Sequence, residues 1–239
     1  DAVENAGVKI RRNVIAPIGA SQLFKAYKYT LNTYVLVDSG RKSTSLSFVG
    51  NNVVYTSSFF SFGFDDLVDA VAGSFNLLHA DAEELVNIYG YDGRKSILNP
   101  AIVTSTINNK PVSFYLDDLN AIVVKYFQDY LTKFNECLTK LMSEYKDIMN
   151  NLNLVFIGEN FKINGFKNYL IKFLNNYSCN FPILPNIGIQ DTCFVNCAGA
   201  ILLSSSYRGT LEDDIKGRIK EINREDDKKD DYSETKDEL

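Results

Sequence analysis

The residues best suited to chemistry lie in one turn, where an apolar stretch ends in an acidic residue. Asp38 follows the continuously apolar run 34–37, and the turn 39–42 leads into Ser43 and Thr44. A carboxylate at the end of a strand can hold a hydrated Mg²⁺, while backbone N–H groups and hydroxyls of the turn approach phosphate. Asp-Ser-Gly is also common in an ordinary hairpin turn, so the turn by itself leaves both interpretations open.

Histidine and cysteine, which often serve catalysis or metal binding, give no such pattern here. The single histidine, His79, has no partner at triad or metal-ligand spacing, and we expect it at the surface. The spacing of Cys193 and Cys197 is not a zinc pattern, and on one helix the two lie too far apart for a disulfide. We therefore expect these two, with Cys137 and Cys179, to be reduced thiols of a cytoplasmic protein.

Composition and charge exclude several classes of function. Of 30 acidic and 25 basic residues, 12 and 7 lie in 211–239, which leaves 18 of each in the first 210 residues. An evenly balanced body has no basic footprint for nucleic acid or anionic lipid. No uncharged apolar run reaches the roughly 18 residues that a membrane-spanning helix needs. Apolar residues make up 45% of the 239, enough for a sizeable core.

The elements that must position the turn alternate between strands and helices. Three closely spaced strands form a meander, and a long amphipathic helix with an aromatic stripe follows further along. Ser21 is expected to cap the first helix. The pattern predicts strands over 8–15, 34–37, 43–49, 53–60, 101–107, 112–116 and 152–157, and helices over 21–29, 65–77, 80–89, 117–149, 161–175 and 192–205.

The order of these motifs is similar to that in FtsA, a family of actin-like bacterial cell-division proteins. The turn is followed by Gly63 entering a helix, and then by Ala82-Glu83-Glu84-Leu85 in the next helix. Val155-Phe156-Ile157-Gly158, with Asn164-Gly165-Phe166 after it, resembles the adenine loop of that family. Ala198-Gly199-Ala200 resembles its late helix. The resemblance covers about residues 4–205.

The resemblance implies the second lobe of a two-lobed protein with an actin-like (ribonuclease H-like) α/β fold, in which helices flank a mixed sheet. Residues 1–30 would connect from a preceding subdomain, and 31–77 with 152–205 would form the sheet subdomain, known as IIA. Residues 78–151 would form an inserted α+β subdomain, IIB, and 206–239 an acidic, largely disordered tail. We expect the other lobe, with its own phosphate loop, to be missing from this chain, so the chain by itself should not hydrolyse ATP.

The resemblance also implies ATP and Mg²⁺ as ligands of the intact protein. Asp38 would bind Mg²⁺ through water, and the other expected contacts are Gly40, Ser43 and Thr44 to phosphate, Glu83 to ribose, and Gly158 in the adenine loop. The chain departs from the family pattern at four glycine positions, which hold Arg41, Lys42, Glu159 and Asn160. Side chains there obstruct close approach of the backbone to a nucleotide. We therefore expect a degenerate nucleotide site.

The expected partner is the C-terminal tail of FtsZ, which subdomain IIB of FtsA receives. Lys125, Lys133 and Lys140 on the helix over 117–149 are candidates for its acidic residues, although a solvated charged face has the same appearance. Self-association into protofilaments is a further expectation. Residues 211–222 carry too many acids to bind a membrane surface. These features predict a cytoplasmic protein at the bacterial division site.

Two other classes of function remain open. One is an ATPase lobe of the Hsp70 or sugar-kinase kind outside cell division, which Mg²⁺-ATP affinity of the full-length protein would distinguish. The other is a luminal protein, because the chain ends in Lys-Asp-Glu-Leu at 236–239, an endoplasmic-reticulum retrieval signal. Asn176 would then be a glycan acceptor.

Overall fold

The structure is a computed structural model that describes residues 5–7, 13–26, 31–91, 99–143, 145, 152–183 and 191–206. The strand expected over 8–15 lies mostly outside the described residues. The tail from residue 207 onward, with the Lys-Asp-Glu-Leu end, also lies outside them. Asn176 is exposed in the turn that follows α6 (Phe166–Phe173).

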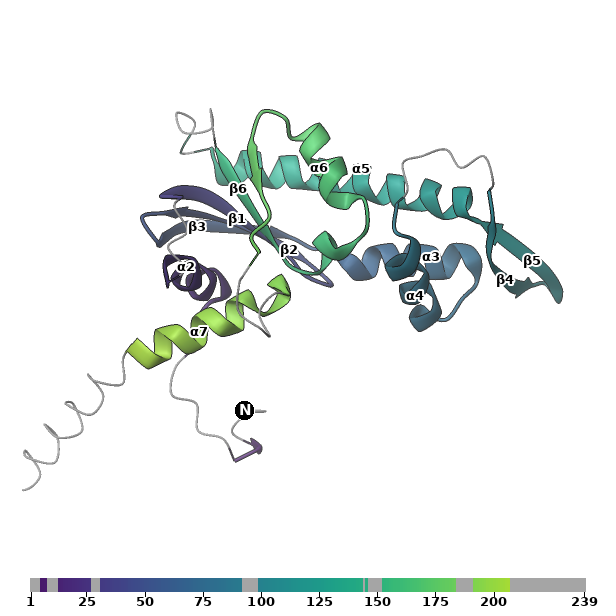
Figure 1. Ribbon diagram of the computed structural model, residues 1–239, viewed down its shortest axis with the longest axis horizontal. Helices are drawn as coiled ribbons and strands as arrows, with labels where there is room; N and C mark the ends of the chain where they lie inside the picture. The colour runs from purple at the N-terminus through teal and green to yellow at the C-terminus, as the bar shows by residue number, and fades with distance from the viewer. Residues whose placement is uncertain are drawn as a thin grey trace, which may run out of the picture.

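A mixed five-stranded sheet, in the order β3-β2-β1-β6-β7, forms the centre of the molecule (Figure 1). Its strands are β1 (Thr33–Ser39), β2 (Thr44–Gly50), β3 (Val53–Phe60), β6 (Asn153–Ile157) and β7 (Ser178–Asn180). The first three are antiparallel neighbours, whereas β6 pairs parallel with both β1 and β7. The run 34–37 is buried on both faces, which explains why it is continuously apolar. The predicted meander and mixed sheet are confirmed.

Asparagine pairs close the two tight hairpins. Asn51 and Asn52 have φ of 50° and 64°, and Asn108 and Asn109 have φ of 51° and 60°. Two successive left-handed residues match the right-handed twist of the flanking strands, and asparagine tolerates this conformation. The second turn joins β4 (Ala101–Ile107) to β5 (Lys110–Tyr115).

Helices cover both faces of the sheet. In Figure 1, α5 (Leu116–Leu141) and α6 lie on one face, and α2 (Ala16–Ala26) and α7 (Val195–Ser206) on the other. Helices α3 (Phe64–Phe75) and α4 (His79–Tyr89) lie with the β4–β5 hairpin near the far end of α5. Among the described residues, no helix combines the length and apolar character needed to cross a bilayer.

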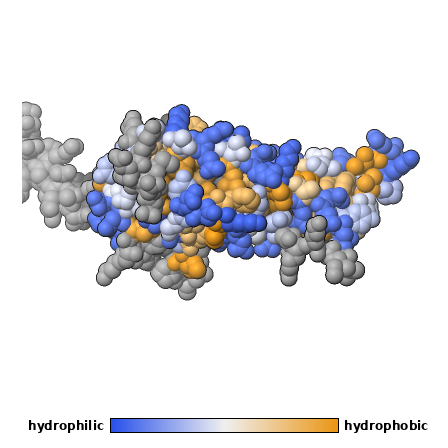
Figure 2. Space-filling model, turned by 90° about the horizontal axis from the view of Figure 1, so that it is seen from above, coloured by the Kyte–Doolittle hydropathy of each residue, from blue (hydrophilic) through white to orange (hydrophobic). Residues whose placement is uncertain are grey.

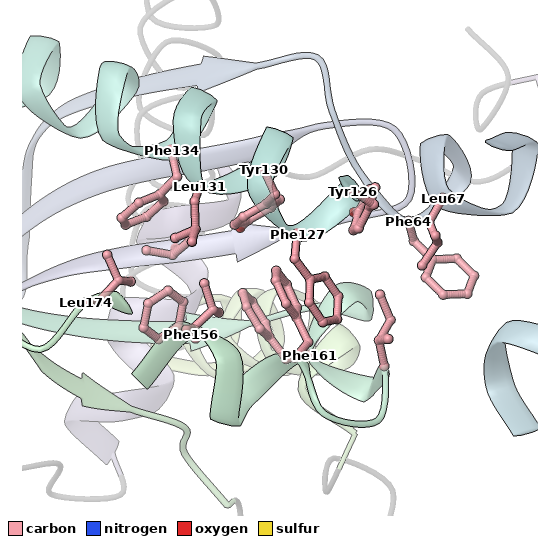
Figure 3. Close-up of a cluster of buried hydrophobic side chains, with 14 of the residues drawn as sticks. Phe64, Leu67, Tyr126, Phe127, Tyr130, Leu131, Phe134, Phe156, Phe161 and Leu174 are labelled. Atoms are coloured by element: carbon pink, nitrogen blue, oxygen red, sulfur yellow. The ribbon is translucent and has the colours of Figure 1, made fainter. Parts of the chain in front are cut away.

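Aromatic rings fill the core between α5 and the sheet (Figure 3). The rings of Phe127 and Phe166 stack at 4.5 Å, and Tyr130 meets Phe166 edge to face at 5.0 Å. Phe156 of β6 lies 5.1 Å from Phe161. Such pairs add stabilisation beyond the burial of their area, so this helix is firmly packed. Helix α5 extends from the sheet to the hairpin and packs on both predicted subdomains.

Two predicted helices differ from the structure because the chain must turn earlier than the apolar pattern indicates. Helix α5 ends at Leu141 rather than near 149, and the ring of Tyr145 folds back to lie 4.7 Å from that of Phe48. The helix predicted over 161–175 is divided. The short 3₁₀ segment η2 (Glu159–Lys162) comes first, and Gly165 at φ 81° then starts α6.

The first helix begins earlier than predicted, at Ala16, with Pro17 in its first turn, where proline is favoured. Ser21 is therefore not a cap. It lies inside the helix, fully buried, and its hydroxyl donates to the carbonyl of Ile18 at 2.9 Å.

Helices α2 and α7 cross at two glycines. A Cβ at Gly199 would overlap the carbonyl of Gly19, and a Cβ at Gly19 would lie 2.7 Å from the carbonyl oxygen of Asn196. Because any side chain with a Cβ would clash at these positions, only glycine lets the two backbones come this close. Gly199, in the small-residue stretch of α7, therefore lets this helix pack closely against α2.

We predict that Gly199→Ala destabilises the chain by about 1–3 kcal/mol, because the added methyl must force the two helices apart. Gly73→Ala is the matched control. Gly73 lies in α3 with nothing within 4 Å of an added Cβ, so alanine should stabilise by about 0.5–1 kcal/mol through helix propensity. Chemical denaturation of both variants measures the change in the free energy of unfolding. Equal changes in the two variants would contradict the close contact of α2 with α7 at Gly199.

Several apolar side chains are exposed on the surface among the polar ones (Figure 2). On the edge strand β3, Val53, Tyr55 and Phe59 are all more than half exposed. All four cysteines are free, and Cys197 is exposed while Cys137 is buried.

Candidate functional site

The turn between β1 and β2 is fixed by the start of α3. The amides of Phe64 and Asp65 donate to the carbonyls of Gly40 and Arg41 at 3.1 and 2.7 Å. A Cβ at Gly63 would collide with both of those carbonyls, which explains the glycine that enters the helix. The amide of Gly40 donates to the carbonyl of Ser43 at 2.9 Å. The turn is therefore ordered through its own backbone and α3.

Asp38 lies at the end of β1, where Asn196 of α7 donates to its Oδ2 at 2.6 Å. Burial raises the pKa of this carboxyl, and the hydrogen bond from Asn196 opposes that effect. The Oδ1 of Asn196 is buried without a hydrogen-bond partner among the described residues. Mg²⁺ favours ionised carboxylates in a water-filled site. The water-mediated Mg²⁺ contact expected of Asp38 stays a prediction.

Thr44 and Ser39 belong to a buried network rather than to an open phosphate site. The side-chain amide of Asn160 donates to the Ser39 hydroxyl at 2.7 Å, and that hydroxyl lies 2.7 Å from the Thr44 hydroxyl. Thr44 donates to the carbonyl of Phe62 at 2.9 Å. Thr44 is fully buried, so its hydroxyl is not available to an external phosphate, whereas Ser43 is exposed.

Tyr126 of α5 completes this network from the opposite side. Its hydroxyl lies 2.8 Å from the carbonyl oxygen of Gly63 and 2.9 Å from Oδ1 of Asn160, so one hydrogen serves two acceptors. Burial raises the pKa of Tyr126, which keeps the hydroxyl protonated as a donor. The long helix is therefore joined by hydrogen bonds to the start of α3 and to the loop after β6.

Arg41, which replaces a glycine of the family pattern, joins the turn to α3 and α4. Its guanidinium donates to both carboxylate oxygens of Glu83 at 2.8 and 2.7 Å, and its Nε lies 2.8 Å from Asp65. The hydrogen bonds from Arg41 lower the pKa of Glu83. Both oxygens of the expected ribose contact are thus bonded within the chain.

The loop after β6 is closed by ion pairs of its own. Gly158, at φ 107°, touches the backbone of Ser39 so closely that no side chain would fit. Lys162 lies 3.2 Å from Glu159 and 2.6 Å from Asp191, and the Cys193 thiol donates to Glu159 at 2.8 Å. Burial raises the pKa of that thiol, which disfavours its thiolate form.

The structure brings the predicted nucleotide contacts to one end of the sheet. Asp38 of β1 pairs with Ile157 of β6, and the next residue, Gly158, therefore lies against Ser39, where the turn begins. Glu83 reaches the same end through Arg41. Lys125, Lys133 and Lys140 lie apart from it, on the exposed side of α5.

Sequence reasoning missed the internal partners Asn196, Asp191, Lys162 and Tyr126. Asn196 is polar in an otherwise apolar helix of small residues, and that was the available signal. Tyr126 was assigned to the apolar stripe of the long helix, where its hydroxyl was the unexplained atom. Asp191, which caps η3 (Thr192–Phe194), and Lys162 of η2 gave no signal, because their pairing joins separate loops.

No protein-family model matches the chain, and no curated protein matches it by sequence. Solved structures match it in fold. MreB5 of Spiroplasma citri bound to ADP is 12% identical, with a TM-score of 0.62, covering 90% of this chain and 64% of MreB5. The ethanolamine utilization protein EutJ from Carboxydothermus hydrogenoformans is 17% identical, with a TM-score of 0.54, covering 82% of this chain and 57% of EutJ.

A third match is the type IV pilus biogenesis complex PilM–PilN, 16% identical with a TM-score of 0.57, covering 83% of this chain and 54% of the matched one. The fold is actin-like. The predicted fold class is thereby confirmed, while the narrower likeness to FtsA stays a prediction. This actin-like chain spans between 54% and 64% of the length of the solved proteins it matches.

We predict that Tyr126→Phe destabilises the chain by about 1–3 kcal/mol, because Asn160 and the Gly63 carbonyl lose a buried donor. Tyr55→Phe is the control, since Tyr55 is 56% exposed and should change stability by less than about 0.5 kcal/mol. Urea denaturation compares the two, and equal small losses would show that the network does not need the hydroxyl.

We also predict a small stability change with pH from Glu83. Its pKa is lower in the folded chain than the ordinary 4.5, so its contribution is complete above that value and disappears as pH falls through the folded pKa. Because the pair is partly exposed, the change should stay below about 1 kcal/mol. Unfolding between about pH 5 and pH 3 should depend less on pH in Glu83→Gln than in Glu84→Gln.

Proposed function

We propose that this chain is the second lobe of an FtsA-like adaptor that acts through protein–protein contacts. One observation carries the proposal: the side chains that would face a nucleotide are bonded to one another. Glu83 is held by Arg41, Asp38 by Asn196, and Glu159 by Lys162. Each internal bond would have to be broken before a nucleotide could take its place. An adaptor needs the fold and its surfaces, and it does not need catalysis by this lobe.

The proposed partner surface is the outward side of α5. Lys125, Lys133 and Lys140 are exposed there, and Lys133 lies 5.5 Å above the ring of Phe62. The same helix also exposes four acids, so its three lysines do not give it a net positive charge; the acids are Asp117, Asp118, Asp129 and Glu136. Attraction to an acidic peptide is therefore modest, and the partner must add apolar contacts. The C-terminal tail of FtsZ is the proposed partner.

Two solved neighbours support assembly with proteins as the role of this fold. PilM is solved as a complex with PilN, and MamK is described as a non-polymerising mutant bound to AMPPNP. By analogy, we propose that the intact protein assembles in the bacterial cytoplasm at the division site. These two neighbours are only 16% identical to the chain, so the analogy rests on fold alone.

We predict saturable binding of a labelled FtsZ C-terminal peptide, measured by fluorescence anisotropy with the full chain. Replacing Lys125, Lys133 and Lys140 together by alanine should weaken binding by about tenfold, because each exposed charge contributes a fraction of a kcal/mol. The matched control replaces Lys25, Lys110 and Lys172, which are exposed on other elements. Equal affinities of the two triple variants would rule out α5 as the receptor.

Nucleotide binding by the intact protein is the second candidate. It is favoured by a hollow of about 570 Å³ beside the loop after β6, lined in part by Lys162, Asp191 and Thr192. The two solved MreB5 structures hold ADP and AMPPNP. Titration of the full-length protein with Mg²⁺-ATP distinguishes this candidate. Micromolar affinity would favour an ATPase lobe over an adaptor.

A further inference from the structure

The guanidinium of Arg41 occupies an acidic site built from two helices. Two of its N–H groups donate to the two oxygens of Glu83, and its Nε lies 2.8 Å from Oδ1 of Asp65 in an ion pair. The guanidinium carbon also lies 5.3 Å from the centre of the Phe64 ring. Bidentate pairing matches the planar fork of arginine to a carboxylate, and the aromatic face adds a second attraction.

The backbone holds Arg41 in position for these contacts. Its carbonyl accepts from the amide of Asp65 at 2.7 Å, and Gly63 lies directly against the same carbonyl. The side chain therefore leaves a fixed turn and reaches α3 and α4 together. Because the backbone of Arg41 is already ordered, forming these ion pairs costs less conformational entropy than forming an ion pair between two mobile surface side chains.

Charge around the site favours a cation. Besides Glu83 and Asp65, Asp69 of α3 lies 3.5 Å from His79. His79 of α4 in turn lies 3.9 Å from Glu83. Three acids thus gather where α3 and α4 begin to pack together. Without Arg41, the carboxylates of Glu83 and Asp65 would lose their cationic partner, and the contact of α4 with the turn would lose its only ion pair among the described residues.

We propose that Arg41 is a built-in ligand of this acidic site, which fixes α4 on the β1–β2 turn with no bound nucleotide. The proposal rests on the proposed function, since an adaptor must keep its inserted subdomain in place without ATP. This role explains why the chain keeps Glu83 while Arg41 replaces the glycine that the family pattern has in the β1–β2 turn. The site is specific for a planar cation, and a free guanidinium ion has the same chemistry.

The test is hydrogen exchange of α4 in the full chain. Arg41→Ala should accelerate exchange of the amides in 79–89 by about tenfold, and Glu83→Ala should do the same, with no further gain in the double variant. Lys42→Ala is the matched control, because it removes an adjacent exposed cation of the same turn. Amides of β1 and β6 should keep their protection, which shows that the variants are folded.

Chemical rescue provides the second measurement. Millimolar guanidinium, far below denaturing concentrations, should restore slow exchange in Arg41→Ala, while the same concentration of ammonium should not. Wild-type exchange rates in Arg41→Ala would overturn the proposal. So would accelerated exchange that is strictly additive in the double variant, because independent effects would mean that Arg41 and Glu83 do not act as a pair.

The same variants separate this proposal from the proposed function. The α5 lysines are unchanged in Arg41→Ala, so peptide binding and α4 exchange are measured independently. Absence of FtsZ-peptide binding by the wild type, together with accelerated exchange in Arg41→Ala, would refute the partner and leave the built-in ligand standing. Peptide binding with unchanged exchange would refute the built-in ligand alone.

Discussion

The parallel pairing of β1 with β6 is the constraint on which the rest of the structure depends. It joins segments more than a hundred residues apart and places the ends of both strands side by side, with Asp38 opposite Ile157. Gly158 can follow only as glycine, since Ser39 leaves no room for a Cβ. The loop after β6 then reaches Ser39 through Asn160, and the long helix reaches the same point through Tyr126.

Around this junction many buried polar groups are bonded within the chain, but Oδ1 of Asn196 and Oδ1 of Asp65 have no hydrogen-bond partner among the described residues. Buried hydroxyls and amides are bonded to one another, and the charged residues nearer the surface form local pairs. A site designed for an external ligand leaves donors and acceptors directed at the space that the ligand fills. Here the positively charged side chains of Arg41 and Lys162 lie near the strand ends. Arg41 is paired with Glu83, and Lys162 with Asp191. The chain keeps the actin-like fold, and the polar side chains at these strand ends bond mainly to other residues of the same chain.

Much of the fold could be predicted from local pattern. The uninterrupted apolar run 34–37 indicated a strand, and the aromatic stripe indicated α5. Gly63 and Gly158 were expected only through the family resemblance, and the structure shows that each lies where two backbones touch. Helix ends were less predictable, because α5 stops where the chain must turn back into the sheet and not where its apolar period ends.

The sequence by itself determined the order of elements, the mixed α/β class, and the residues able to meet at the strand ends. Only the tertiary structure decided their partners. Arg41 and Glu83 are 42 positions apart, and Asp38 and Asn196 are 158 apart, so no local rule connects them. Hydrogen bonds and ion pairs act over a few ångströms, and those distances exist only once the chain has folded. Whether Glu83 faces a ligand or Arg41 is therefore a property of the fold.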